Sequence, residues 1–267
     1  MSRLFFLIFI LSINITSCFK SYAQIINIDK TDTSAYEKKS RWNASFSVGI
    51  EVDKQKTTLL DASNFADVSL QHYHELFIVS ASNRITSNGD KSFLNTGYVH
   101  IRWRHEYKNR LHPEAYVQYQ WDEQRGMLHR FVSGANLRYS LRHHQNWDMT
   151  FATGVMYENE AWDYAAVDSS KIPTNPVTRK TSVAKSNNYV KWDEQISTNS
   201  TLSIILFYQA LYTHFFQPRI STFISYDATI SKHFSLGLKY NALYDVKPIV
   251  PIPYFYYSLS TNLSYKL

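Results

Sequence analysis

The sequence predicts an all-β fold: a closed, antiparallel, up-and-down transmembrane β-barrel of about 12 strands with a polar lumen. Three observations favour this class. Apolar and polar residues alternate with a period of two along most of the chain, as in strands with one apolar and one polar face. The 267 residues include 20 Tyr, 16 Phe and 6 Trp but only 7 Gly, which favours strands. The segments that read as strands number twelve, and bacterial outer-membrane barrels have even strand numbers.

The predicted domain organisation begins with a signal peptide at 1–23. Arg3 precedes an apolar run at 4–11 that is too short to span a bilayer, and Ser-Tyr-Ala before Gln24 is a suitable cleavage site, so cleavage is expected after Ala23. The alternative is lipidation at Cys18, whose preceding residues resemble a lipoprotein box. Cleavage after Ala23 leaves a mature chain without cysteine, which excludes disulfides and thiol catalysis.

After the signal peptide, the sequence predicts a periplasmic lead-in or plug segment at 24–41, which is polar and aperiodic, and then the barrel at 42–267. Cleavage removes two cations and no acid, so the net charge falls from +6 to +4. This charge is too small and too scattered to indicate nucleic acid as a partner. No apolar run reaches the roughly 18–20 residues of a membrane helix, which excludes a helical transporter.

Alternation begins at residues 42–52, where Trp42, Phe46 and Ile50 face one side and Asn43 and Ser47 the other. Segments 64–73, 75–87 and 187–198 alternate less clearly and are assigned as strands because their neighbours need partners. The predicted strands span residues 42–54, 64–73, 75–87, 92–106, 111–122, 127–141, 147–158, 187–198, 200–212, 217–230, 234–245 and 255–267.

The predicted connections fall into a short and a long class that alternate along the chain. The long class includes 55–63, 159–186 and 246–254, and 159–186 is long enough to fold over a barrel mouth. Outer-membrane barrels show this asymmetry, with tight periplasmic turns and longer outside loops.

Alternation also fits a soluble barrel with an apolar interior, such as a lipocalin, which would be extracted without detergent. Large charged groups on the polar face, and a strand number above the eight of soluble barrels, favour an apolar face toward lipid. Aromatic residues also gather near both strand ends, as in the interfacial girdles of membrane barrels. They are Trp42, Tyr107, Tyr139, Trp147 and Tyr265 at one rim, and Trp121, Tyr157, Tyr212, Tyr244 and Tyr257 at the other.

The last strand alternates as far as Leu267, where assembly machinery generally favours an aromatic residue. The expected partners are the outer-membrane lipid bilayer, the barrel-assembly machinery through this C-terminal strand, and small solutes. No cofactor is expected, and the expected location is the cell outer membrane of a Gram-negative bacterium.

Several segments carry a family pattern: NTGYVHIR at 95–102, EAYVQYQWD at 114–122, RFVSGANLR at 130–138, GVMYE at 154–158 and KSNNY at 185–189. They resemble a family of unknown function that includes the salt-induced outer-membrane proteins, and its Bacteroidota members most of all. The resemblance covers most of the mature chain and implies an outer-membrane barrel. It supplies no established activity and no catalytic residue.

The polar strand faces carry a candidate lumen network. Tight turns would place Arg102 and Arg104 opposite or diagonal to Glu114, and Arg138 opposite Asp148. Two interpretations stay open: a constriction of fixed charges that selects solutes, or a lattice of ion pairs that fills and stiffens a narrow barrel. The network residues are Arg102, Arg104, Glu114, Gln118, Gln120, Asp122, Arg130, Arg138, Asp148 and Glu158.

Three further motifs carry less information. His72 and His74 share a strand face, which permits metal ligation, but no third ligand can be placed beside them. Ser87-Asn88-Gly89 resembles the Ser-Asn-Gly of outer-membrane phospholipases, although Ile85 stands where the histidine base belongs. Asn43, Asn199 and Asn262 match the glycosylation sequon by chance in a bacterial-type barrel.

These observations predict an integral outer-membrane β-barrel that is not an enzyme. It is expected to act as a narrow passive channel or as a structural, stress-linked envelope component. Two alternatives remain: an outer-membrane lipid hydrolase that uses Ser87, and a surface binding or assembly partner that uses the 159–186 loop.

Overall fold

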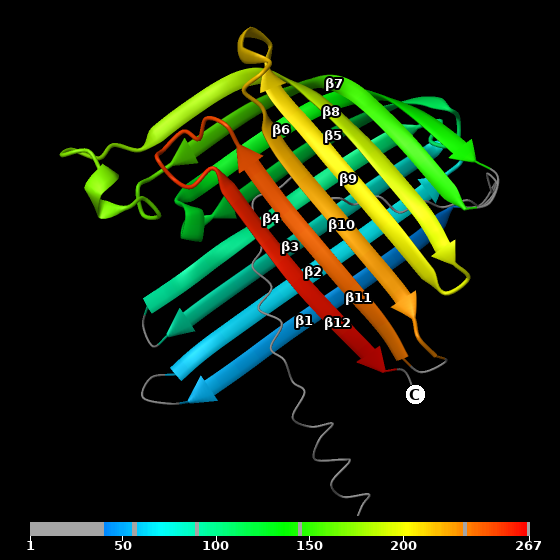
Figure 1. The fold of residues 1–267 in the computed structure, drawn as a ribbon, viewed down its shortest axis with the longest axis horizontal. Coiled ribbons are helices and arrows are strands. Elements are labelled where there is room, and N and C mark those ends of the chain that lie inside the picture. Colours follow the sequence, from blue (N-terminus) through cyan, green and yellow to red (C-terminus); the bar gives the residue numbers. More distant parts are fainter. Residues whose placement is uncertain (1–39, 55–57, 89–90, 144–145, 232–233, 266–267) are drawn as a thin grey trace, which may run out of the picture.

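A computed structural model describes residues 40–54, 58–88, 91–143, 146–231 and 234–265. The predicted signal peptide at 1–23 and nearly all of the lead-in at 24–41 lie outside these residues. Twelve antiparallel strands form one sheet, and each strand pairs with its neighbours in the sequence (Figure 1). The predicted all-β, up-and-down topology is therefore confirmed. In the described part of the chain, no helix is both long and apolar enough to cross a membrane.

The strand bounds follow the predicted segments closely. The strands are β1 Arg41–Lys54, β2 Thr58–His72, β3 Glu75–Asn88, β4 Lys91–His105, β5 Leu111–Asp122, β6 Met127–His143, β7 Trp147–Trp162, β8 Arg179–Ser197, β9 Ser200–Leu211, β10 Arg219–Thr229, β11 Phe234–Asp245 and β12 Phe255–Tyr265. Short 3-10 turns follow β5 (η1, Glu123–Arg125) and β9 (η3, Tyr212–His214), and η2 (Ser169–Lys171) lies between β7 and β8.

Three strands are longer than the alternation predicts by at least four residues. β2 begins at Thr58, β7 runs to Trp162 and β8 begins at Arg179, so the long connections expected at 55–63 and 159–186 are wrong in length. The first half of β8 shows the physical reason, because Lys180 and Ser182 occupy its outer face where apolar residues would have marked a strand. The longest connection is 163–178.

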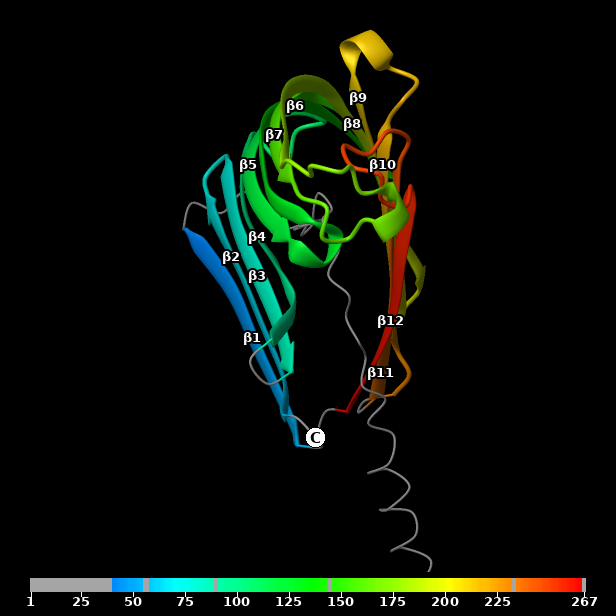
Figure 2. The ribbon, with the colours of Figure 1, turned by 90° about the vertical axis from the view of Figure 1, so that its left-hand side faces the viewer.

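The sheet is curled, so that β1–β3 and β10–β12 lie on opposite sides of an interior (Figure 2). Among the described residues no ladder joins β1 to β12, and the sheet has these two strands as its edges. β1 is exposed along nearly its whole length on both faces. Closure of the sheet into a barrel therefore stays a prediction.

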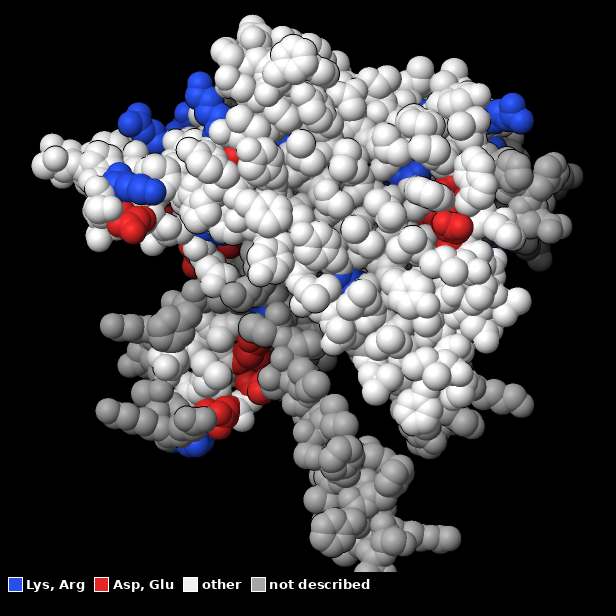
Figure 3. Space-filling model, in the orientation of Figure 1, with Lys and Arg blue, Asp and Glu red and all other residues white. Residues whose placement is uncertain are grey.

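The polar face of each central strand is the buried one. In β5, Glu114 and Gln118 are 1% exposed, whereas Val117 and Tyr119 on the other face are 42% and 46% exposed. The outward surface over β9–β12 accordingly carries few charges (Figure 3). This arrangement is the reverse of that in water-soluble proteins, where charged side chains are almost never fully buried unless they are paired.

The two ends of the sheet differ in their connections. We call the end with 163–178, 212–218 and 246–254 the loop end, and the opposite end, with 73–74 and 198–199, the turn end. The strand bounds put the two predicted aromatic sets at these two ends. Tyr107 departs from the girdle, because it is buried against Leu76 and Ile78. The side chain of Tyr265 lies outside the described residues.

Candidate functional site

Glu114 of β5 is the centre of the first of two ionic clusters in the interior. Its Oε2 accepts hydrogen bonds from Arg104 Nε and Arg138 Nη1, both at 2.8 Å, and lies 3.7 Å from Arg102 Nε. The β4–β5 register puts Arg104 directly opposite Glu114, which confirms that pairing. One carboxylate thus binds three guanidinium groups, so the first cluster carries net positive charge.

The other oxygen of Glu114 is bound from two more strands. Asn136 Nδ2 of β6 donates to Oε1 at 3.1 Å, and the Tyr189 hydroxyl of β8 donates to it at 3.0 Å. The Tyr189 ring packs on Phe207 with ring centroids 5.1 Å apart. Tyr189 reaches Glu114 from a strand that does not neighbour β5, so side chains of β4, β5, β6 and β8 meet at this height.

The second ionic cluster lies nearer the loop end. Arg130 Nε donates to Glu158 at 2.7 Å and to Glu160 at 2.9 Å. Arg219 binds both of these glutamates, and its Nε donates to Asp245 Oδ2 at 2.8 Å. Lys185 also pairs with Glu158. Three cations meet three carboxylates, so this cluster is electrically balanced.

A chain of amides joins the two clusters. Asn187 donates to Asn136 at 3.1 Å, Gln209 donates to Asn187 at 3.0 Å, and Arg130 Nη2 donates to Gln209 at 3.3 Å. The first of these contacts crosses β7 at Gly154, which lies opposite both asparagines in the ladders. A Cβ on Gly154 would lie 2.4 Å from Asn136 Oδ1 and 2.0 Å from a backbone oxygen, so only glycine leaves room for the bridge.

The remaining predicted network residues have mixed outcomes. Gln118 binds His100 Nδ1 at 2.9 Å and donates to Gln120, and Asp122 is buried at the loop end of β5. The predicted pairing of Arg138 with Asp148 is wrong. Arg138 lies opposite Ala152, whereas the backbone of Asp148 lies opposite Arg142, because β6 runs to His143 before its turn.

Several network members were not predicted: Glu160, Tyr189, Lys185, Arg219 and Asp245, and the bridging amides Asn136, Asn187 and Gln209. Glu160 and Lys185 fell inside the supposed 159–186 loop. The alternation along β10 could have identified Arg219 as an inward-facing residue, because Arg219, Ser221 and Phe223 lie on the same face of that strand. Nothing in the sequence marks Tyr189 as a partner of Glu114, because that contact depends on how tightly the sheet curls.

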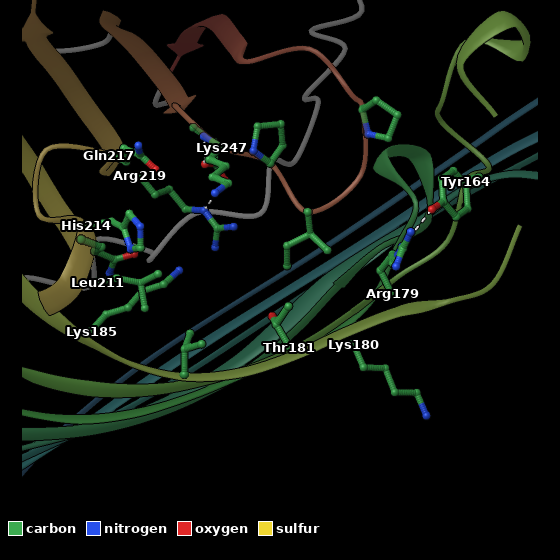
Figure 4. A pocket seen from close by; sticks show the side chains of 16 residues that line it. Tyr164, Arg179, Lys180, Thr181, Lys185, Leu211, His214, Gln217, Arg219 and Lys247 are labelled. Atoms are coloured by element: carbon green, nitrogen blue, oxygen red, sulfur yellow. Dashed lines mark hydrogen bonds and ion pairs between the residues drawn. The ribbon is translucent and has the colours of Figure 1, made fainter. Parts of the chain in front are cut away.

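A cavity of about 560 Å³ opens at the loop end, above the second cluster (Figure 4). Lys185 and Arg219 of the second cluster line it, together with the exposed side chains of Arg179 and Lys247. The Arg179 Nε donates to the Tyr164 hydroxyl at 3.1 Å, which ties the start of β8 to the 163–178 loop. In the same loop, hydrogen bonds from Ser170 lower the pKa of the Asp168 carboxyl.

An apolar cap holds the loops around this cavity. The capping side chains come from two loops and from the loop-end segments of β6 and β7: Met127, Trp162, Val167, Val250 and Ile252. Arg125 packs against it, with its guanidinium 4.4 Å from the Tyr256 ring centroid and 5.6 Å from that of Trp162. Burial lowers the pKa of Arg125, whereas the Asp122 carboxylate and the Tyr256 ring favour its charged form.

The other candidate motifs lie outside this network. His72 Nδ1 lies 2.7 Å from Ser40 Oγ, and His74 Nδ1 lies 3.3 Å from Glu106. No group of three or more His, Cys, Asp or Glu among the described residues could hold a metal ion. Ser87 lies opposite Ser92 at the end of β3. The β3–β4 register places His100, the histidine of β4, opposite Ser80 and not opposite Ser87. Gly89 lies outside the described residues.

No protein-family model matches the chain, and no curated protein matches it. The family resemblance drawn from the segments between 95 and 189 therefore stays a prediction.

Glu114→Gln tests the first cluster. The variant leaves three buried guanidinium groups without their carboxylate, so we expect the free energy of unfolding to fall by about 3–5 kcal/mol. Urea titration in detergent, followed by tryptophan fluorescence, measures it. Glu123→Gln, at an exposed glutamate, is the matched control and should change little. Equal stabilities of the Glu114 variant and the parent would contradict the central role of Glu114.

Gly154→Ala tests the amide bridge. The added methyl group must displace backbone or the Asn136 amide, so we expect a loss of about 1–3 kcal/mol in the free energy of unfolding. The control is Gly49→Ala, whose closest contact would be the movable Ser63 hydroxyl. The bridge is not needed if both variants unfold at the same urea concentration as the parent.

Proposed function

We propose that the chain is an integral outer-membrane β-barrel that acts as a structural component of the Gram-negative envelope. The observation that carries this proposal is the inverted polarity of the sheet. Arginines and glutamates such as Arg130 and Glu158 are about 1% exposed, whereas apolar residues such as Val155 and Leu137 are 57% and 48% exposed. Monomeric water-soluble proteins rarely expose apolar patches of this extent, but a lipid-facing surface requires them.

A lipid environment is energetically favourable for the outer face of the sheet, and ion pairing stabilises its inner face. In water, the outer face would form a continuous apolar surface at a cost of about 25 cal/mol for each Å² that could have been buried. In lipid this cost disappears. The inner face keeps its charges because each cluster supplies opposite charges and amide donors. The outer-membrane location, rather than another membrane, rests on the predicted signal peptide and on the absence of a membrane-spanning run in the sequence.

Closure of the sheet is part of the proposal. β1 and β12 are antiparallel, because the sheet is a meander with an even number of strands. Their unpaired N–H and C=O groups would each cost several kcal/mol in hydrocarbon. Pairing of β1 with β12 in the membrane removes that cost, and it would bring the exposed faces of both edge strands into one wall.

Of the two predicted roles, the filled interior favours a structural one over a channel. The Glu114 cluster, the amide bridge and the second cluster form one connected set of side chains across β4–β10. A permeating ion would have to separate buried pairs whose arginines and glutamates are at most 8% exposed, which is unfavourable. The prediction that this structural role is linked to stress rests only on the resemblance to the salt-induced outer-membrane proteins.

The structural role predicts that the purified protein does not conduct. Full-length protein reconstituted in planar bilayers should give no resolved current steps in 1 M KCl, because side chains occupy the interior. A known porin inserted by the same procedure is the positive control. Regular single-channel steps from the parent that change size in Glu114→Gln would instead support the channel role.

Cysteine cross-linking tests closure. Serines on the inner sides of the edge strands are replaced in pairs, Ser45 or Ser47 with Ser258 or Ser260, in a Cys18→Ser background. In native membranes at least one of these four combinations should form a disulfide on mild oxidation, because paired strands bring Cα atoms within the roughly 7 Å that a disulfide needs. Ser45→Cys with Ser221→Cys, on β10, is the control and should not cross-link. Absence of a cross-link in all four combinations would contradict closure.

A further inference from the structure

Arg102 of the first cluster has a buried donor that Glu114 does not satisfy. Glu114 already accepts four hydrogen bonds, which is about the capacity of a carboxylate. Arg102 Nε lies 3.7 Å from Glu114 Oε2, beyond hydrogen-bond distance, and has no hydrogen-bond partner among the described residues. Because Arg102 is only 4% exposed, leaving this charged donor without an acceptor is costly.

The strand positions around Arg102 supply no second carboxylate. Ile78 of β3 and Tyr116 of β5 lie opposite it in the ladders, and His100 and Arg104 precede and follow it on the same face of β4. A further acid for Arg102 must therefore come from another part of the chain or from outside it.

The chain enters β1 at the end of the sheet where the first cluster lies. Arg41, the first residue of β1, lies opposite Gln71, and Arg104 lies opposite Leu76, so both adjoin the 73–74 turn. Three strand spacings of about 4.8 Å, or about 14 Å in all, separate β1 from β4. The chain that precedes β1 thus starts close to the cluster.

The lead-in at 24–41 carries two aspartates that can reach the cluster. An extended chain spans about 3.3 Å per residue, so Asp32 can lie up to about 30 Å from Arg41 and Asp29 up to about 40 Å. Both distances exceed the separation between β1 and β4. The lead-in is therefore long enough to bring a carboxylate to Arg102.

The inner faces of the edge strands leave room for such a segment. Ser45 and Ser47 of β1 and Ser258 and Ser260 of β12 face inward, yet none of the four is buried. β1–β3 and β10–β12 lie across the interior from one another (Figure 2). The short hydroxyl side chains can form hydrogen bonds with a peptide backbone that runs between these strands.

We propose that the lead-in enters the interior at the turn end and that Asp29 and Asp32 bind the first cluster at Arg102. A tethered carboxylate has an advantage over a soluble anion, because tethering by a short flexible chain gives effective concentrations in the millimolar range. The bound lead-in closes the turn end of the interior. The proposal needs only the curled sheet and does not depend on the membrane location or the structural role proposed above.

Glu37 supplies a matched control for the aspartates. It lies in the same segment and has the same charge, but Lys38 and Lys39 follow it directly. Its approach to the first cluster would bring two more cations toward the arginines, so it should stay outside the interior. The control for Arg102 is Arg84, whose ion pair with Asp61 lies elsewhere in the interior.

The experiment measures how fast iodoacetamide alkylates a cysteine in the lead-in of the full chain in neutral detergent. Thr31→Cys, in a Cys18→Ser background, places the thiol between the two aspartates. Each rate is divided by the rate for the same variant unfolded in urea, which removes the effect of neighbouring charges on the thiol. We expect a ratio below about 0.1, because the bound lead-in protects the thiol.

Asp29→Asn combined with Asp32→Asn should raise this ratio about tenfold, the loss of one charge-assisted hydrogen bond. Arg102→Gln should raise it as much. All three substitutions together should raise it no further, because they remove the same contact. Glu37→Gln and Arg84→Gln should leave it unchanged. The aspartates lie outside the strands, so their variants test the contact even if Arg102→Gln weakens the sheet.

Three results would overturn the proposal. The first is a Thr31→Cys thiol that reacts as fast in the folded protein as in urea. The second is an unchanged ratio in the double aspartate variant, which would indicate that a soluble anion or another partner binds Arg102. The third is an equal rise in the ratio with Glu37→Gln, which would indicate a diffuse attraction that depends on charge alone.

Discussion

The structure depends on the binding of buried guanidinium groups by a few buried carboxylates. Without Glu114, Arg102, Arg104 and Arg138 would lose the carboxylate that they share, and removing one partner of a buried ion pair costs several kcal/mol. Glu158 and Glu160 perform the same task for β6, β8 and β10. Arg219 of β10 binds both glutamates of β7, a strand that is not its neighbour in the sheet, so this contact opposes flattening of the curl.

The same charge balance connects the interior to the mouth. The second cluster neutralises Arg219 and Lys185 internally, so the cavity above it has a neutral floor. The other cations that line the cavity are Arg179, at the start of β8, and Lys247, in the 246–254 loop. The paired charges of the second cluster thus lie deeper than the exposed cations Arg179 and Lys247.

Alternation predicted which face of each strand is polar, and a tight turn predicted the pairing of Arg104 with Glu114. Both depend only on local geometry. The pairing of Arg138 with Asp148 failed because two extra residues at the end of β6 shift the register that brings strands together. Lys185 was missed because polar outer residues hide the first half of β8. The Tyr189–Glu114 contact depends on curvature, which no local pattern encodes.

The central claim is that the apolar outer face meets lipid. Spin labels on single cysteines at Val117, Val155 and Val177 test it in proteoliposomes, since the first two lie on the outer face and Val177 is 70% exposed in the 163–178 loop. If the outer face meets lipid, we expect oxygen, which partitions into lipid, to relax the labels at Val117 and Val155 more than a water-soluble nickel chelate does. At Val177 the order should reverse. Equal access of the nickel chelate to all three sites would contradict a lipid-facing sheet.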